Sequence, residues 1–139
     1  MSEQAPNWQP ISMLAFLTDH IADGIAMVAE QKGTLERGLA KPYALDDATV
    51  TRVKTVFSQT AKDNELFAEQ GRRWAAEPDL TAEQRRGVER YQELVEQITA
   101  ETNAVLAIAD QLADATIETL MAKSDLEVGI EALLRGGKL

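Results

Sequence analysis

The strongest structural signal in the chain is the stretch YQELVEQITAETNAVLAIADQLADATIETLMA, residues 91–122. It lacks Gly, Pro, Lys and Arg, and it is rich in Ala and Leu, which favour helix. Apolar residues recur in it at steps of three and four, which is the spacing of a helix face that other helices must cover. The members of this stripe are Leu94, Val95, Ile98, Val105, Leu106, Ile108, Leu112, Ile117, Leu120 and Met121. We therefore expect one long helix, from Ala82 to Ala122.

An earlier stretch carries a first covering stripe. A helix is expected to begin at Pro10 or Ile11, because proline is tolerated in the first turn, and to end at Gly38. The stripe comprises Ile11, Leu14, Thr18, Ile21, Ile25, Val28, Lys32, Leu35 and Leu39. Glycines in its second half weaken the helix, so fraying or an early stop near Gly33 is possible. Residues 1–10 are polar and are expected to form a flexible arm, with Trp8 as the one anchor.

A second covering stripe follows a break at residues 41–43. Asp46 or Asp47 provides the helix cap, and Pro78 with Asp79 closes the helix. The stripe comprises Val50, Val53, Phe57, Thr60, Asn64, Phe67, Gly71 and Trp74. Polar residues in the middle of this helix and of the third one predict a polar layer in the core that fixes helix register. They are Thr60, Asn64, Thr102 and Asn103.

The connections complete the predicted fold. Thr81 and Gln84 have the spacing of a capping box, and the short turn before them makes the second and third helices an antiparallel hairpin. Ser124 and Glu127 repeat that spacing ahead of a short fourth helix, although the pattern leaves open whether residues 123–125 break the third helix. We therefore expect an all-α, elongated antiparallel helical bundle of three long helices plus a short C-terminal helix, with residues 11–139 as a single domain.

Composition narrows the classes of function. The net charge of −9 excludes a protein that binds nucleic acid by neutralising phosphates, and it favours a protein partner with an amphipathic or basic helix. The chain has no cysteine and one histidine, so neither a thiolate nor a multi-histidine metal site is expected, and no cofactor is expected. Residues 1–10 contain neither the basic nor the apolar part of a signal peptide, and no uninterrupted apolar run reaches about 18 residues, so we expect neither secretion nor a membrane span. We expect a cytoplasmic protein.

The one histidine, His20, is the candidate for chemistry. His20 and Gly24 have the spacing seen in histidine phosphotransfer domains, where a small residue one turn after the histidine leaves space for the phosphoryl group. Those domains usually carry a lysine just before the glycine, whereas this chain has Asp23, which would repel a phosphoryl group. A surface histidine without chemistry is the favoured interpretation, and phosphotransfer is the alternative. No other catalytic set is present, and we predict that the chain is not an enzyme.

Two charged surfaces are candidates for partner binding. An arginine cluster lies at the hairpin end beside Trp74, which is expected to be exposed there. The cluster either binds a partner or an anion, or it stabilises the end of the second helix and pairs with Glu89. It comprises Arg72, Arg73, Arg85, Arg86 and Arg90. The second candidate is an acidic row at four-residue spacing, which repels itself on a helix and would suit a basic partner. The partner-binding prediction is this row with the apolar residues that follow it: Asp110, Asp114, Glu118, Leu120, Leu126 and Ile130.

A resemblance adds a specific function. The size, the acidic cysteine-free composition, the predicted helices and the stretch YQELVEQITAETNAVL, residues 91–106, resemble FlgN-like flagellar export chaperones, of the FlbY-type branch. Those proteins tend to carry Asn-x-x-Asn-Gly followed by Leu in this helix; here Asn103 matches, and Ala100 and Ala104 take the other places. The resemblance implies a cytoplasmic chaperone that holds helical C-terminal segments of hook-filament junction proteins. The alternatives are the phosphotransfer protein and a structural homodimer.

Overall fold

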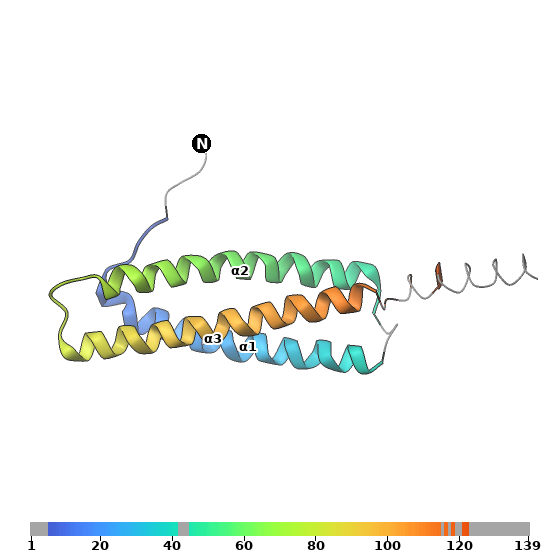
Figure 1. Cartoon of the computed structure of the whole chain (residues 1–139), viewed down its shortest axis with the longest axis horizontal. Helices are drawn as coiled ribbons and strands as arrows, with labels where there is room; N and C mark the ends of the chain where they lie inside the picture. Colours follow the sequence, from blue (N-terminus) through green and yellow to red (C-terminus); the bar gives the residue numbers. More distant parts are fainter. Residues whose placement is uncertain (1–5, 42–44, 115, 117, 119–120, 123–139) are drawn as a thin grey trace, which may run out of the picture.

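The computed structural model describes residues 6–41, 45–114, 116, 118 and 121–122. One turn of 3-10 helix, η1 (Ile11–Met13), leads into α1 (Leu14–Ala40), which is followed by α2 (Asp47–Ala75) and α3 (Ala82–Ala113). The three long helices lie side by side in an elongated bundle, in which α2 runs antiparallel to α1 and α3 (Figure 1). The predicted all-α bundle of three long helices is confirmed. The expected fourth helix, with Leu126 and Ile130, lies outside the described residues.

Helix starts follow the capping residues of the sequence. Asp46 accepts a hydrogen bond from the backbone N–H of Thr49 at 2.8 Å, and hydrogen bonding with the Thr49 side chain and then with its backbone lowers the pKa of the Asp46 carboxyl. At the start of α3, the Thr81 hydroxyl accepts from the Gln84 N–H at 3.0 Å, and the Gln84 side chain accepts from the Thr81 N–H at 2.8 Å. The predicted capping box is therefore confirmed. The first helix runs past Gly33 and Gly38 to Ala40.

The core lies where α3 packs against both α1 and α2. Every member of the two covering stripes is buried or half-buried, as the periodicity predicts. The most deeply buried large side chains of the described residues include Ile21, Trp74, Val88, Tyr91, Val105 and Leu112. At the hairpin end, the Trp74 and Tyr91 rings meet edge to face at 5.1 Å, and the Tyr91 hydroxyl donates to the Phe67 carbonyl at 2.8 Å. Burial raises the pKa of Tyr91 to about 12.

Two glycines bring α1 close to α3. A Cβ atom on Gly24 would lie 2.9 Å from Cδ1 of Ile98, and one on Gly87 would lie 2.9 Å from Cδ2 of Leu14. Both distances are shorter than a normal carbon–carbon contact, so the neighbouring side chain occupies the space that a larger residue would need. Gly24 therefore has a packing role in α1 that offsets its weaker helix propensity.

The predicted third helix is too long by nine residues, because α3 ends at Ala113 rather than at Ala122. After Asp114 the chain turns back to the start of α2, where the buried Thr116 hydroxyl donates to the Asp47 carboxylate at 2.6 Å. The Glu118 carboxylate accepts from the Asp47 backbone N–H at 3.0 Å, which places negative charge at the N-terminus of α2. Glu118, Met121 and Ala122 are again helical. These two hydrogen bonds give partners to the backbone N–H and the carboxylate of Asp47 at the start of α2.

The polar layer is confirmed for two of its four residues. Asn64 of α2 is buried and donates to the Thr102 hydroxyl of α3 at 3.1 Å, and Thr102 in turn donates to the Ile98 carbonyl at 2.7 Å. Thr60 is half-buried and donates to the Val56 carbonyl of its own helix, and Asn103 is exposed. The layer is therefore a single bridge between α2 and α3.

Candidate partner-binding groove

A groove runs between α1 and α2. Each of these helices packs against α3, but they make few direct contacts with each other. The space between them has a volume of about 490 Å³, and Ile98 of α3 forms its floor. The walls are mostly apolar and are formed by Ile21, Met27 and Val28 from α1 and by Val53, Val56, Phe57 and Phe67 from α2. Together with Ile98 and the flanking His20, Gly24, Gln31, Arg52, Thr60, Asp63 and Asn64, these residues define the α1–α2 groove.

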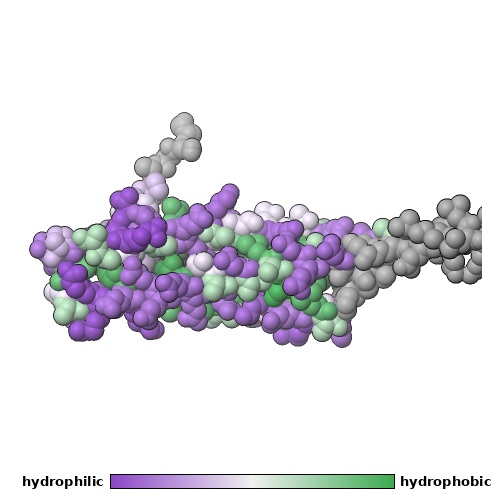
Figure 2. Space-filling model, in the orientation of Figure 1, coloured by the Kyte–Doolittle hydropathy of each residue, from purple (hydrophilic) through white to green (hydrophobic). Residues whose placement is uncertain are grey.

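Exposed apolar side chains concentrate along this groove. Met27 is 69% exposed and Val56 is 52% exposed at its mouth. Phe16 and Leu66, which are also exposed, line a neighbouring hollow of about 410 Å³ toward the hairpin end. Figure 2 shows one face of the molecule, which is largely hydrophilic and has hydrophobic patches between the polar residues. Clustered exposed apolar residues with polar neighbours are characteristic of a binding surface.

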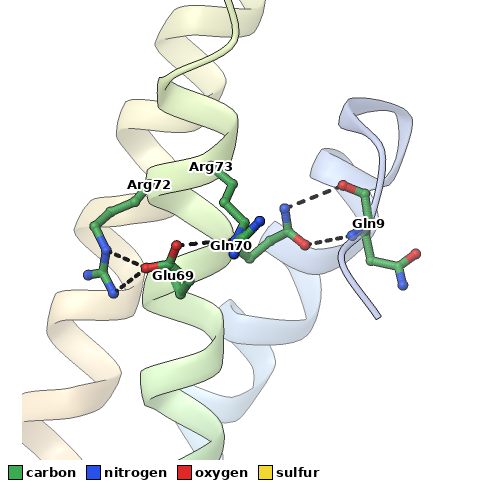
Figure 3. Close-up of polar contacts among 5 residues, drawn as sticks. All are labelled: Gln9, Glu69, Gln70, Arg72 and Arg73. Atoms are coloured by element: carbon green, nitrogen blue, oxygen red, sulfur yellow. Dashed lines mark hydrogen bonds and ion pairs between the residues drawn. The ribbon is translucent and has the colours of Figure 1, made fainter. Parts of the chain in front are cut away.

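The N-terminal arm lines the neighbouring hollow and is bound to the C-terminal part of α2. The Gln9 N–H donates to the Gln70 side-chain carbonyl at 2.7 Å, and the Gln70 amide donates back to the Gln9 carbonyl at 3.3 Å (Figure 3). That carbonyl also accepts from the Trp74 indole N–H at 3.0 Å. The Trp8 ring lies 4.3 Å from the Arg73 guanidinium carbon, a cation–π contact. Trp8 is therefore not the one anchor of residues 6–10, since the Gln9 backbone provides the hydrogen bonds.

Most of the arginine cluster interacts within the molecule. Arg72 and Arg73 pair with the Glu69 carboxylate at 2.8 and 3.2 Å (Figure 3). Arg85 donates to the carbonyls of the turn at Pro78 and Glu77, at 3.3 and 3.5 Å, rather than pairing with Glu89. Arg86 and Arg90 are exposed. The expectation of an exposed tryptophan beside the cluster is wrong, because Trp74 is 1% exposed.

The acidic row does not lie on one helix face. Asp110 is on α3 and pairs with Lys54 of α2 at 2.9 Å, whereas Asp114 is the C-terminal cap of α3 and Glu118 binds the start of α2. Two of the three carboxylates thus contact α2. Met121, the last member of the predicted stripe that the structure describes, is 61% exposed. Leu120, Leu126 and Ile130 lie outside the described residues, so the acidic partner surface stays a prediction.

His20 lies at the rim of the α1–α2 groove. Its ring is exposed and lies 5.8 Å from the Phe67 ring, tilted by 59°. Gly24, one turn on, faces Ile98 of α3, which explains that glycine without a phosphoryl group. Within the described ranges, no group of three or more His, Asp or Glu side chains is placed to hold a metal ion. The phosphotransfer alternative stays a prediction.

The first helix, with the 3-10 turn before it, is the one candidate membrane span among the described residues. Ile11–Ala40 is long and apolar enough to cross a membrane, a test that core helices of soluble proteins pass as well. Its buried side chains pack against α3, and Asp19 and Asp23 interrupt its exposed surface with carboxylates, which are costly in lipid. Only 11% of its most apolar window is buried in the bundle, so the absence of a membrane span stays a prediction.

Apolar residues directly beside the stripe residues in the sequence are a signal for the groove. Val56 and Leu66 directly precede the stripe residues Phe57 and Phe67, and Met27 directly precedes Val28. Apolar side chains next to the stripe widen the apolar face beyond what one neighbouring helix can cover.

No protein-family model, curated protein or solved structure matches this chain.

Proposed function

We propose that this chain is a non-enzymatic binding protein that holds an amphipathic helix of a protein partner in the α1–α2 groove. The observation that carries this proposal is the groove itself, with exposed Met27 and Val56 at its mouth and Ile98 at its floor. An amphipathic helix buries its apolar face in such grooves through side chains at positions i, i+3, i+4 and i+7.

The dimensions suit a helix of moderate length. On α2 the groove extends from Arg52 to Phe67, about 22 Å at 1.5 Å per residue, which corresponds to about four helical turns. A partner with apolar anchors on one face would cover Met27 and Val56. The net charge of −9 favours basic residues on the part of the partner that remains in solvent.

The resemblance in sequence supplies the identity of the partner in this proposal. We propose a cytoplasmic flagellar export chaperone of the FlgN-like class, whose client is the helical C-terminal segment of a hook-filament junction protein. In this proposal the client binds mainly in the apolar groove, rather than on the acidic row predicted from the sequence. Asp114, at the C-terminal cap of α3, adds negative charge at that end of the bundle, whereas the Asp110 carboxylate is paired with Lys54 of α2.

Binding of a labelled junction-protein C-terminal peptide, measured by fluorescence anisotropy, tests the proposal. Met27→Glu combined with Val56→Glu places two carboxylates in the apolar contact, and we expect at least a tenfold loss of affinity. Met121→Glu is the matched control, because Met121 is similarly exposed but lies outside the groove.

Three outcomes would contradict the proposal in different ways. Unchanged affinity in the groove variant excludes the groove as the binding site. Loss of affinity on charge reversal of Asp110, Asp114 and Glu118, with the groove variant unaffected, assigns the peptide to the acidic row instead. No binding of any junction-protein peptide, together with a dimeric mass in solution, favours the homodimer, in which a second copy fills the groove.

A further inference from the structure

We infer that the hollow beside the groove is a second subsite for the same partner helix. It takes a bulky apolar side chain that lies about eleven residues, or three helical turns, from the side chain bound between Met27 and Val56 in the groove. The inference rests on the proposed function, because it requires a helix in the groove. It adds the spacing and the kind of side chain by which that helix is recognised.

The exposed large apolar side chains of α1 and α2 form two pairs with this spacing. Met27 and Val56 line the groove. Phe16 and Leu66 line the hollow. The two sites are eleven residues apart on α1 and ten on α2, which corresponds to about 16 and about 15 Å at 1.5 Å per residue. Both spacings are close to three turns, so each helix presents its two exposed residues on one face.

The groove and the hollow adjoin each other. Phe67 of α2 lines both spaces. Because α1 and α2 are antiparallel neighbours, the hollow lies toward the start of α1 and toward the end of α2, and the groove follows in the same direction on both helices (Figure 1). A straight helix that lies along the groove can therefore reach both sites.

The hollow suits a bulky apolar side chain. Its volume is about 410 Å³, and none of its lining residues is charged. An apolar side chain placed there would cover Phe16 and Leu66, and burial of apolar surface is favourable by about 25 cal/mol per Å². The N-terminal arm provides a further wall through Trp8, and the two hydrogen bonds between Gln9 and Gln70 hold that wall in place (Figure 3).

Three carboxylates between the two sites indicate the charge of the partner. Asp19 and Asp23 are exposed on α1, three and seven residues after Phe16, so they share its helix face. Asp63 lines the groove from α2 and accepts a hydrogen bond from the Gln59 amide at 3.1 Å. Among the described residues, none of these three carboxylates is in an ion pair. Lys or Arg between the two apolar anchors of a partner helix would complement them.

The same charges disfavour a second copy of this chain as the occupant. A two-fold axis at the middle of the span would bring the carboxylates of one copy toward those of the other. Arg52, the basic residue that lines the groove, lies beyond Val56 and therefore outside the span between the two sites. A separate helix with basic residues fits this surface better than another chain with a net charge of −9.

Two labelled model peptides test the spacing. Both have a helical host of Ala, Gln and Lys with Leu residues on the face that enters the groove. The first carries Phe about eleven residues from the outermost Leu, on the same face, and the second carries it about nine residues away, on the opposite face. Each is made in both chain directions. By fluorescence anisotropy, the first peptide should bind the native chain about tenfold more tightly than the second, in one of the two directions.

A matched pair of protein variants assigns this preference to the hollow. Phe16→Glu with Leu66→Glu changes two exposed residues of the hollow and should lower the affinity of the first peptide to that of the second. Met27→Glu with Val56→Glu should weaken both peptides, because the groove is common to them. Circular dichroism checks that both variants keep their helical content.

The outcomes separate the subsite from the proposed function. Equal affinity of the native chain for the two peptides, or a preference that survives in the hollow variant, overturns the second subsite and leaves the groove in place. Peptide binding that is unaffected by the groove variant, or no binding of any peptide, overturns the proposed function together with the subsite. A native dimer that becomes monomeric in the hollow variant assigns the hollow to a second copy instead.

Discussion

The two flanks of α1 differ in how they meet their neighbours. Toward α3, the helix presents Ile21 and Gly24, and the small glycine lets Ile98 approach until no space remains for a Cβ atom. Toward α2, the same helix presents Met27 at the groove and Phe16 at the neighbouring hollow, and both side chains stay largely exposed. Both flanks are apolar, so hydrophobicity alone does not close an interface. The closed flank has a glycine that permits close approach, whereas the large side chains of the open flank are separated from α2 by the groove and the hollow.

The largest expected effect is a difference in unfolding free energy between alanine variants on the two flanks of α1. Ile21→Ala removes a side chain that is almost fully buried against α3 and should lower the free energy of unfolding by about 3 kcal/mol. Phe16→Ala removes a larger side chain from the open flank and should cost less than about 1 kcal/mol, because that ring is already in solvent. Urea unfolding measures both. Similar losses for the two variants would mean that the open flank is covered in the folded chain.

The second effect concerns the closed interface between α2 and α3, where burial raises the pKa of Tyr91 to about 12. The neutral phenol is favoured in the folded chain, so its stabilising contribution is complete below pH 10 and is lost as the pH rises toward 12. A rise of that size in the Tyr91 pKa corresponds to a loss of stability on the order of 2 kcal/mol by about pH 12. Urea unfolding at pH 9 to 12 measures this loss.

Tyr91→Phe is the matched variant for that experiment. It gives up the hydrogen bond to the Phe67 carbonyl, which should cost about 1 kcal/mol at neutral pH. Its stability should fall less steeply between pH 10 and 12, since the titrating group is gone. Equal slopes in the two proteins would show that other groups, such as lysines, cause the alkaline loss.

Local signals in the sequence predicted the parts of the fold that depend on neighbours a few residues apart. The caps at Asp46 and Thr81 and the period of each stripe are of this kind, and the structure confirms them. The end of α3 was missed because its cause is distant in sequence: Thr116 and Glu118 bind Asp47, some 70 positions away. A helical pattern that continues through residues 114–122 contains no sign of that partner.

The groove was missed for a related reason. A stripe shows which residues prefer to be buried, but it does not show how many neighbouring helices are available to bury them. Val56 and Met27 extend the apolar faces of their helices, and only the arrangement of α1 and α2 around α3 leaves them uncovered. The carboxylates of residues 110–118 were more conspicuous in the sequence, yet two of them contact α2.

The smallest effect lies where the closed α2–α3 interface borders the open groove. Thr102→Val keeps the shape of the side chain but leaves the buried Asn64 amide without its acceptor, and it should cost about 1.5 kcal/mol. Changing both partners, Thr102→Val with Asn64→Leu, removes the need for a hydrogen bond and should restore most of that loss. Urea unfolding of the two single variants and the double variant gives the coupling between the sites.

The same double-mutant cycle shows whether Asn64 serves the α2–α3 interface or the groove. Asn64 lines the groove while it donates to Thr102 across the closed interface. If the closed interface fixes it, the double variant should regain stability and keep its affinity for the partner peptide, because the apolar walls at Met27 and Val56 are unchanged. A double variant that stays as unstable as Thr102→Val would contradict this and indicate that Asn64 is needed on the groove side. The bridge would then be part of the binding surface rather than of the core.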